Sequence, residues 1–259
     1  MKKIIVLPFI SFLYFGCSKQ SATATATANN ISKNSRISEL QTALTTLQFS
    51  GYTWYVKNSG NSTQGPGPNY WNKANAFVDA NGWLHLKLKK SGSKWVCAEI
   101  WSQQSFGNGS YQFQVEGAID KFDKNVVLGL FNYSGNDGFD EMDIEFARWG
   151  NRNYPNLNYT IWPAQTGYNN FSYTQEFALT GTYTTHRFTR SNDSVILKSM
   201  HGFTNTDTNL FAGAVCTSPP NSVSRLAMPV HLNLWLFQGN APSNNKPVEI
   251  IIHSFTYTP

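Results

Sequence analysis

The sequence predicts an all-β fold, a jelly-roll sandwich of two curved antiparallel sheets. Short segments in which apolar and polar residues alternate recur along most of the chain, separated by Gly, Pro and Asn turn signals, as in sandwiches and jelly rolls. Aromatic residues make up 15% of the chain and charged residues 14%, a composition that favours strands over helices. The sequence contains no long amphipathic helix, P-loop or dinucleotide-binding fingerprint that would favour another fold.

The expected strands follow one another at short intervals. Residues 76–89 predict a hairpin, because Asp79-Ala80-Asn81-Gly82 is a turn signal between two alternating runs. Further strands are expected at 110–116, 126–133, 141–146, 158–162, 185–189, 195–199, 230–237 and 248–257. Many short strands with turn residues between them argue against a parallel α/β sheet.

The N-terminus is typical of an export signal. Met1-Lys2-Lys3 is a positively charged start, and residues 4–15 are an apolar run too short to cross a bilayer as a stable helix. Gly16-Cys17 then resembles a bacterial lipoprotein signal in which Cys17 becomes the lipidated first residue, although Tyr14 stands where such signals usually have Leu. Ordinary cleavage nearby, with Cys17 removed or free, is the alternative. We expect a signal peptide over 1–17 and an exported protein, either a cell-envelope lipoprotein or a secreted one.

A tether is expected between the signal and the folded domain. Residues 18–48 begin with a Ser, Thr, Ala and Asn stretch that has no apolar period and cannot form a core. A short helix within it is an option, since Ser38 and Gln41 form a capping-box pattern, followed by the leucines of residues 40–47 on one face. The folded domain is then expected to span residues 49–259.

The net charge bears on the expected partners, and the cysteines raise the question of a disulfide. The net charge is only +5, and its densest group, Lys87, Lys89 and Lys90, is interpreted as a solvated strand face, so no nucleic-acid partner is expected. Export places the chain in an oxidising compartment. Cys97 and Cys216 could therefore form one disulfide or remain two buried free thiols, because the sequence does not fix their separation.

The segment that carries most information is Glu141-Met142-Asp143-Ile144-Glu145, with three carboxylates at strict alternation. In a strand, residues i, i+2 and i+4 share one face, so the three acids (here called the triad) point to one side. Met142 and Ile144 then point to the other side. Like charges stacked on one face destabilise a strand unless something offsets their repulsion, which suggests a function.

The spacing of the triad suits glycosidic chemistry. The α-carbons of Glu141 and Glu145 are roughly 13 Å apart in a strand. If the side chains lean towards each other, their carboxyl groups end about 5–6 Å apart, as in a retaining glycosidase. Crowding also separates the pKa values of carboxyl groups, so that one stays protonated while another is ionised. A solvated polar strand face or a cation site built from carboxylate oxygens is the alternative.

The triad and its neighbours resemble a known family. Residues 139–146, Phe-Asp-Glu-Met-Asp-Ile-Glu-Phe, resemble the signature of glycoside hydrolase family 16 in its lichenase (β-1,3-1,4-glucanase) branch. Weaker similarities lie at Phe106–Tyr111, Cys97–Glu99, His186–Phe188 and Asn233–Trp235, so the resemblance covers roughly residues 50–259. It implies a jelly roll with a substrate cleft on its concave face.

The resemblance also assigns roles. It implies that Glu141 is the nucleophile, that Asp143 assists it, and that Glu145 is the acid/base. It also implies substrate contacts at Glu99, Phe139, Asn233 and Trp235, and Trp101 is a further candidate because it shares a predicted strand face with Glu99. Their aromatic members are suited to stacking on the apolar faces of sugar rings. Trp149 and Trp162 are weaker candidates for the same role.

Two departures from the family pattern leave the substrate open. Relatives commonly have Arg where this chain has Trp101, and an aromatic-acidic pair where it has Thr189-Arg190. No residue clearly matches the partner of the family disulfide that involves the position of Cys97. The five His residues lack metal-ligand spacing, and His186 is interpreted as a hydrogen-bonded core residue.

Together these observations predict a retaining endo-glycosidase that cleaves a β-glucan, β-1,3-1,4- or β-1,3-linked. A non-catalytic carbohydrate-binding protein and a transglycosylase, or a hydrolase of another polysaccharide on the same fold, are the alternatives. The expected partners are a polysaccharide and, through the lipid at Cys17, a membrane; the protein is expected to be a monomer. No cofactor is expected to be required, and the family's structural calcium remains an option without assignable ligands.

Overall fold

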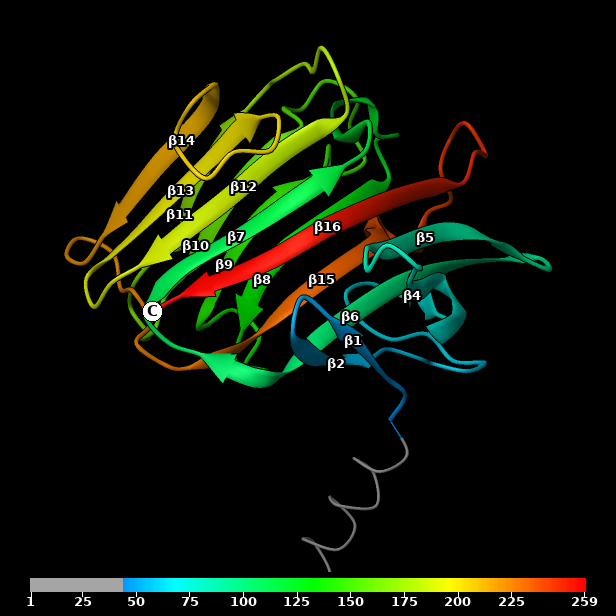
Figure 1. Ribbon diagram of the computed structural model, residues 1–259, viewed down its shortest axis with the longest axis horizontal. Helices are drawn as coiled ribbons and strands as arrows, with labels where there is room; N and C mark the ends of the chain where they lie inside the picture. Colours follow the sequence, from blue (N-terminus) through cyan, green and yellow to red (C-terminus); the bar gives the residue numbers. More distant parts are fainter. Residues whose placement is uncertain (1–43) are drawn as a thin grey trace, which may run out of the picture. The chain divides into compact units, whose positions relative to one another are not determined.

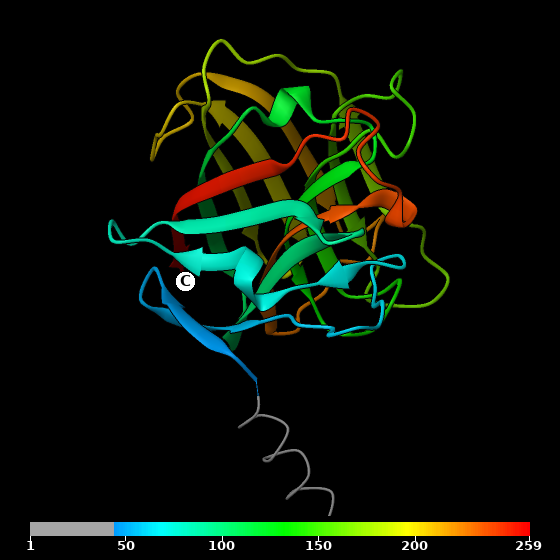
Figure 2. The same ribbon diagram turned by 90° about the vertical axis from the view of Figure 1, so that its right-hand side faces the viewer.

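Two antiparallel sheets pack face to face across a hydrophobic core in the computed structural model, which describes residues 44–259. Figure 1 shows one sheet in front of the other, and the turned view shows the two layers facing each other (Figure 2). A long hairpin joins the layers, because β5 (Leu84–Ser91) pairs with the start of β6 (Lys94–Phe106). The predicted jelly-roll sandwich is therefore confirmed.

The other sheet, here called the cleft sheet, has the strand order β11-β10-β9-β8-β15-β6, with β2 and then β1 beyond β6. Its strands β8, β9 and β10 lie behind the other layer in Figure 1. Its strands are β1 (Thr46–Phe49), β2 (Tyr52–Val56), β6, β8 (Val126–Tyr133), β9 (Glu141–Phe146), β10 (Leu157–Trp162), β11 (Phe171–Gln175) and β15 (Met228–Leu236). The short β3 (Tyr70–Trp71) runs parallel to β6.

The front layer, here called the outer sheet, has the order β5-β16-β7-β12-β13-β14, and β4 pairs with β5. Its further strands are β4 (Ala76–Val78), β7 (Gly109–Glu116), β12 (Tyr183–Arg190), β13 (Ser194–His201), β14 (Leu210–Thr217) and β16 (Val248–Thr258). Three 3-10 helices, η1 (Lys73–Asn75), η2 (Ile119–Lys121) and η3 (Phe237–Gly239), complete the described elements.

Alternating side chains fill the space between the sheets. Leu84, Leu86 and Leu88 of β5 are fully buried, while His85 and Lys87 between them face outwards. The cleft sheet contributes aromatic side chains to the same core. His186 of β12 is buried there and bonds Ser199 and Thr184 at 2.8 Å each, and burial lowers its pKa to about 3. Its interpretation as a hydrogen-bonded core histidine is confirmed.

The structure corrects the expected start of the folded domain. β1 begins at Thr46, so residues 46–48 belong to the sheet and not to the tether predicted over 18–48. Leu47 pairs with Trp54 of β2, which excludes it from the suggested short helix, because its backbone groups are used by a strand. The signal peptide 1–17, the lipidation site Cys17 and the rest of the tether lie outside the described residues.

The structure shows the state of the two cysteines and the place of Arg190. Cys97 on β6 and Cys216 on β14 are both free and buried, which is the second of the two alternatives. Arg190, one half of the departure at Thr189-Arg190, is buried and donates to the carbonyl oxygens of Ser224 and Leu226. It therefore holds a loop and does not contact the cleft. Within residues 44–259, no helix has the length and apolarity to cross a membrane.

Candidate active site

The triad lies where the alternation predicted, on the face of β9 that points away from the core and towards the cleft. Met142, Ile144 and Phe146 are fully buried in the core, so Glu141, Asp143 and Glu145 face the other way. β8 and β10 pair with β9 on either side, and this fixes the three carboxyl groups on an inner strand. The register that sets their positions is therefore held from both edges.

Cross-strand pairing continues the triad into two rows of side chains over the cleft sheet. The first row runs through Glu145, Gly129, Asn233 and Glu99. The second runs through Asp143, Phe131, His231 and Trp101. Residues far apart in the sequence thus meet on one surface because β6, β15, β8 and β9 are neighbours.

Gly129 is required at its place in the first row. A β-carbon there would lie 2.5 Å from Oδ1 of Asn233, closer than nonbonded atoms approach. The absence of a side chain lets the Asn233 amide lie over β8, between Glu99 and Glu145. Asn233 is 2% exposed, and its Oδ1 has no hydrogen-bond partner among the described residues. It is therefore a buried acceptor facing the cleft.

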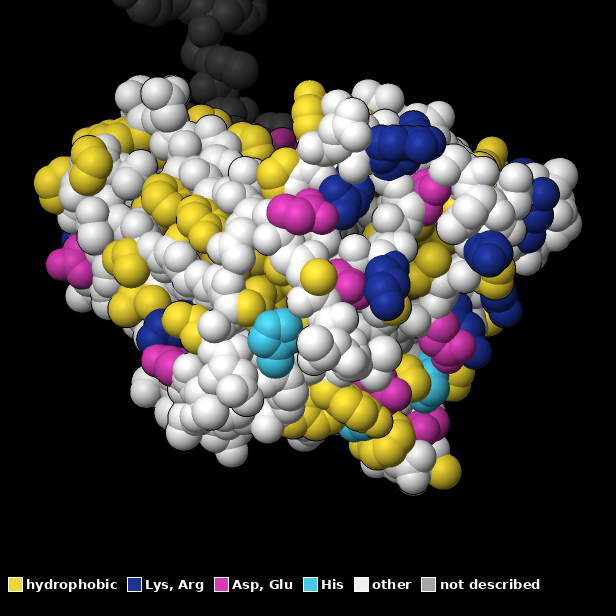
Figure 3. Space-filling model, turned by 90° about the horizontal axis from the view of Figure 1, so that it is seen from above, with side chains coloured by type: hydrophobic (Ala, Val, Ile, Leu, Met, Phe, Trp, Pro, Cys, Tyr) yellow, Lys and Arg dark blue, Asp and Glu magenta, His cyan; other side chains and the backbone are white. Residues whose placement is uncertain are grey.

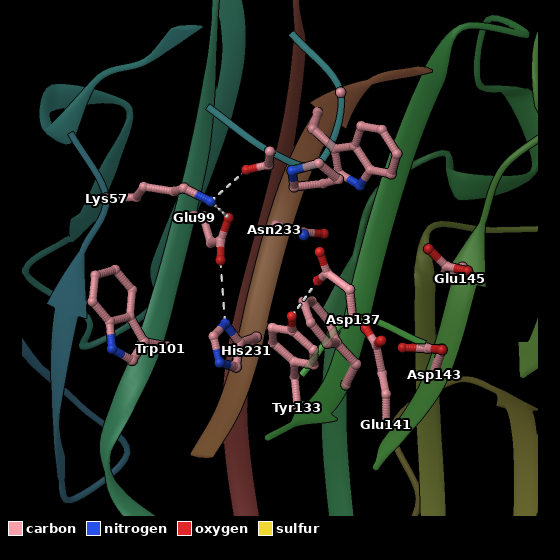
Figure 4. A pocket seen from close by; sticks show the side chains of 15 residues that line it. Lys57, Glu99, Trp101, Tyr133, Asp137, Glu141, Asp143, Glu145, His231 and Asn233 are labelled. Carbon is pink, nitrogen blue, oxygen red and sulfur yellow. Dashed lines mark hydrogen bonds and ion pairs between the residues drawn. The ribbon is translucent and has the colours of Figure 1, made fainter. Parts of the chain in front are cut away.

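These rows form the floor of a cavity of about 690 Å³ (Figure 4). It is lined by Lys57, Gly65, Pro66, Gly67, Glu99, Trp101, Phe131, Tyr133, Asp137, Glu141, Asp143, Glu145, His231, Asn233 and Trp235. In Figure 4 the triad occupies one side, and Lys57, Glu99 and Trp101 occupy the other. Seven of the eight residues expected from the sequence thus share one site.

Phe139 is the exception. It is half-buried and does not line the cavity. The turn that contains it instead brings Asp137 to the cavity, where Asp137 accepts a hydrogen bond from the Tyr133 hydroxyl. A direct contact of Phe139 with sugar remains a prediction.

Asp143 is the most enclosed member of the triad. It is 3% exposed, and Trp162 of β10 donates from Nε1 to its Oδ2 at 3.1 Å. A hydrogen bond also links Asp143 with Glu141. Trp162 thus orients the central acid of the triad, a different role from the sugar contact considered for it.

Crowding and burial raise the pKa of every member of the triad. Burial, followed by the charge of Glu141, raises the pKa of Glu145 to about 8. Burial raises the pKa of Glu141 to about 7, although its hydrogen bond with Asp143 opposes the increase. Burial and both neighbouring glutamates hold the pKa of Asp143 well above its usual range. Of the two glutamates, Glu141 therefore ionises first, and its hydrogen bond with Asp143 favours its ionised form.

A charged network forms the opposite side of the cleft. Lys57 Nζ lies 2.7 Å from Oε2 of Glu99 and donates to the Gly65 carbonyl oxygen at 2.6 Å. His231 Nδ1 lies 3.2 Å from Oε1 of Glu99. Burial alone would raise the pKa of Glu99, but the hydrogen bond with His231 and the charge of Lys57 lower it below its usual value. Glu99 is therefore an ionised anchor for Lys57 and His231.

Aromatic rings line the cleft between the charged groups. His231 stacks with Trp101 at 6.2 Å and with Phe131 at 5.0 Å between ring centroids. Trp235, 8% exposed, packs against Trp149 with 6.3 Å between centroids. Such rings offer flat apolar surfaces beside hydrogen-bonding groups, the combination that sugar rings require.

Several site residues were missed in the sequence. Lys57 follows β2, a strand that the alternation did not reveal, and its partner Glu99 is 42 residues away. Tyr133 and His231 lay on predicted strands, and alternation from Phe131 and Asn233 could have placed both on the cleft face. Within residues 44–259 no group of three or more His, Cys, Asp or Glu side chains could hold a metal ion.

Comparison with solved structures identifies the fold. The chain is similar to a β-glucanase of Bacillus licheniformis, with 21% identity and a TM-score of 0.61 over 80% of this chain and 92% of that one. It is also similar to a β-1,3-1,4-glucanase (lichenase) from a mouse hindgut metagenome, with 19% identity and a TM-score of 0.58 over the same shares of the two chains. The fold is thus the lichenase-like fold of glycoside hydrolase family 16, as the motif predicted.

A third similar structure shows that this fold does not guarantee hydrolysis. An immunostimulatory antigen of Mycobacterium tuberculosis, described as a pseudo β-1,3-glucanase, matches with 16% identity and a TM-score of 0.58 over 77% of this chain and 88% of that one. No protein-family model matches the sequence, and no curated protein matches it.

Proposed function

We propose that this protein is a retaining endo-glycosidase that hydrolyses a β-glucan, β-1,3-1,4- or β-1,3-linked. The observation that supports the proposal most is the triad, in which three carboxyl groups with raised pKa values face a cleft lined by aromatic side chains. Crowding of this kind is expected where acid-base chemistry is carried out and is unfavourable elsewhere.

The proposed reaction has two displacements. Glu141 attacks the anomeric carbon, and the bond from that carbon to the leaving oxygen breaks while Glu145 gives that oxygen its proton. Glu145, now ionised, takes a proton from a water molecule whose oxygen attacks the same carbon and releases Glu141. Asp143 is a positioning residue, because its hydrogen bond with Glu141 favours the ionised nucleophile before the attack and can weaken as the covalent intermediate forms.

The cleft's charges support a neutral polymer as substrate. Lys57, the only Lys or Arg lining the described cavity, is already paired with Glu99. Sulfated or uronic polymers would bring anionic groups next to Glu141 and Asp137 without a free cation to receive them. Uncharged glucose units, which need aromatic faces and hydrogen-bond acceptors, fit this surface better.

A substrate panel tests the proposal. Lichenan, laminarin, xyloglucan and sulfated galactans are offered to the wild-type chain, and reducing ends are measured. We expect release from lichenan or laminarin, and almost none from sulfated galactans. Glu141→Gln and Glu145→Gln should each remove most of the hydrolysis while glucan binding persists. Wild-type activity in either variant would refute the assignment.

A non-catalytic glucan-binding protein is the second candidate, favoured by the pseudo β-1,3-glucanase among the similar structures. The triad argues against it, since binding alone does not need three crowded acids. Binding to lichenan without any release of reducing ends would establish it. Transfer of the intermediate to a sugar would instead give products longer than a defined starting oligosaccharide.

We further propose that the chain is exported and held at a membrane by a lipid on Cys17. The support is the sequence alone, a charged start and an apolar run that end at Gly16-Cys17. Expression in a bacterial host with a radiolabelled fatty acid, followed by membrane fractionation, tests it. Cys17→Ser should abolish labelling and move the chain from the membrane to the soluble fraction. Equal labelling of both chains would refute the lipid anchor.

A further inference from the structure

A second hollow lies on the outer sheet, on the opposite layer from the cleft. It has a volume of about 490 Å³ and is lined by side chains of β7, β12 and β16 together with Asn205. Its lining is made of hydroxyl and amide groups, apart from one cation: Ser110, Gln112, Arg187, Thr189, Thr256 and Thr258. Nothing in the proposed reaction uses this surface.

The cation in this hollow is neutralised. Arg187 donates from Nη1 to Asp207 at 3.0 Å and from Nε and Nη2 to Oε1 of Gln112 at 3.0 and 2.6 Å. Lys198 pairs with the other oxygen of Asp207. A ligand would therefore meet hydroxyl and amide groups rather than a free charge, which favours an uncharged, hydroxyl-rich molecule over an anion.

An exposed aromatic group stands beside the hollow. Tyr183 and Phe203 are 49% and 38% exposed, and their rings meet edge to face with 4.9 Å between centroids. His253 contacts both rings, and Trp83 packs on His253 at 4.0 Å. The lower margin of Figure 3, the side of the outer sheet, shows hydrophobic side chains exposed beside histidine and acidic ones.

The aromatic group and the hollow are aligned along one strand. Tyr183 begins β12, and Arg187 and Thr189 follow on the same outward face, so Tyr183 lies roughly 13 Å along the strand from Arg187. Phe203 is two residues from Asn205, which lines the hollow. The aromatic rings, which can stack on sugars, and the polar hollow, which can form hydrogen bonds, thus lie one after the other over the length of a few sugar units.

We propose that this surface is a second glycan-binding site, which holds a neutral β-glucan chain along β12. The sugar rings stack on Tyr183 and Phe203, and the hydroxyl groups beyond them bond Thr256, Thr258 and Asn205. The choice of a β-glucan rests on the function proposed for the cleft. Because the two sites lie on opposite sheets, the outer site would hold the protein on an insoluble particle without blocking the cleft, and so raise the effective substrate concentration.

The test measures binding to insoluble β-1,3-glucan particles by sedimentation. The full chain carrying Glu141→Gln is used so that the particles are not degraded, and a short soluble oligosaccharide fills the cleft. Adding Tyr183→Ala and Phe203→Ala should weaken particle binding by about tenfold or more, since two stacking rings are lost. Thr256→Val, which removes one hydroxyl at constant size, should weaken it by a few fold.

The matched control is Tyr154→Ala, because Tyr154 is also 49% exposed but lies on the loop after β9. It should bind like the parent chain. Unchanged binding by the Tyr183 and Phe203 double variant, or equal loss in Tyr154→Ala, would overturn the proposal. So would light scattering that shows a dimer lost in the double variant, since a second copy would then occupy the surface.

Failure of this site and failure of the cleft assignment give different results. With Glu141 intact, the double variant should hydrolyse soluble lichenan at the wild-type rate and lose activity only on particles. Binding that depends on Tyr183 and Phe203 in a chain that hydrolyses nothing would keep the outer site and refute the enzyme. If the wild-type chain hydrolyses glucan and the double variant binds and degrades particles like wild type, the enzyme assignment stands and the outer site is refuted.

Discussion

Replacing Glu145, the proposed acid/base, by glutamine should stabilise the protein at alkaline pH and remove the proposed hydrolysis. The pKa of Glu145 is raised from its usual 4.5 to about 8 by burial and by Glu141. The folded chain therefore binds this proton more tightly than the unfolded chain does. Between these two pH values folding takes up a proton, so stability is present below pH 4.5 and is lost as pH rises towards 8.

The magnitude follows from the pKa difference. Each pH unit in this interval costs about 1.4 kcal/mol of unfolding free energy, so the whole interval costs at most on the order of 4 to 5 kcal/mol. Because the three acids titrate together, removing one charge should recover about half of this. We expect Glu145→Gln to be more stable than wild type by about 2 kcal/mol at pH 8, or roughly 4–8 °C in Tm, and by almost nothing at pH 4.5.

Thermal unfolding followed by circular dichroism from pH 4.5 to 8.5 measures this difference. Glu176→Gln is the control, because Glu176 is an exposed carboxylate paired with Arg148 and its removal should change stability by no more than about 1 kcal/mol. A stability difference between Glu145→Gln and wild type that is independent of pH would refute the reasoning, because the charge would then not be the source of the cost.

Three further outcomes are expected. The plot of kcat/KM against pH should be bell-shaped, rising near pH 7 and falling near pH 8 as the two glutamates of the triad ionise in turn; a flat profile from pH 5 to 8 would contradict this. Gly129→Ala should lower stability by about 1–3 kcal/mol in denaturant titrations, because its β-carbon would strike Asn233. Since Cys97 and Cys216 are free, a reductant should leave Tm unchanged, and a drop of several degrees would indicate a disulfide.

Two of the strands that the sequence revealed have one face in the core and the other face turned away from it. β5 alternates without interruption, and β9 does so with carboxylates on its outward face. β6 was missed because residues 96–100 are all buried. Its core side packs between the sheets, while on its cleft side Cys97 contacts Asn69 and Glu99 pairs with Lys57. A strand buried on both faces loses the period of two.

Only part of the site could be predicted from the sequence. Spacing within one strand brought the triad together, because its geometry is local. The pairing of Lys57 with Glu99 depends on β2 lying beside β6, which no local pattern indicates. The sequence also could not decide whether Cys97 and Cys216 pair. Only the folded chain shows that they belong to different sheets.

The departure at Trp101 can be explained by the same long-range contact. The family pattern that the sequence resembles has an Arg there, two residues after Glu99, and a carboxylate that is buried and ionised like Glu99 needs a cation. Here the cation comes from Lys57, the residue that follows β2. Position 101 is thereby free to carry an aromatic ring, and Trp101 stacks beside His231 and Tyr55. Lys57 thus supplies the positive charge from another part of the chain, and Trp101 adds an aromatic surface to the cleft.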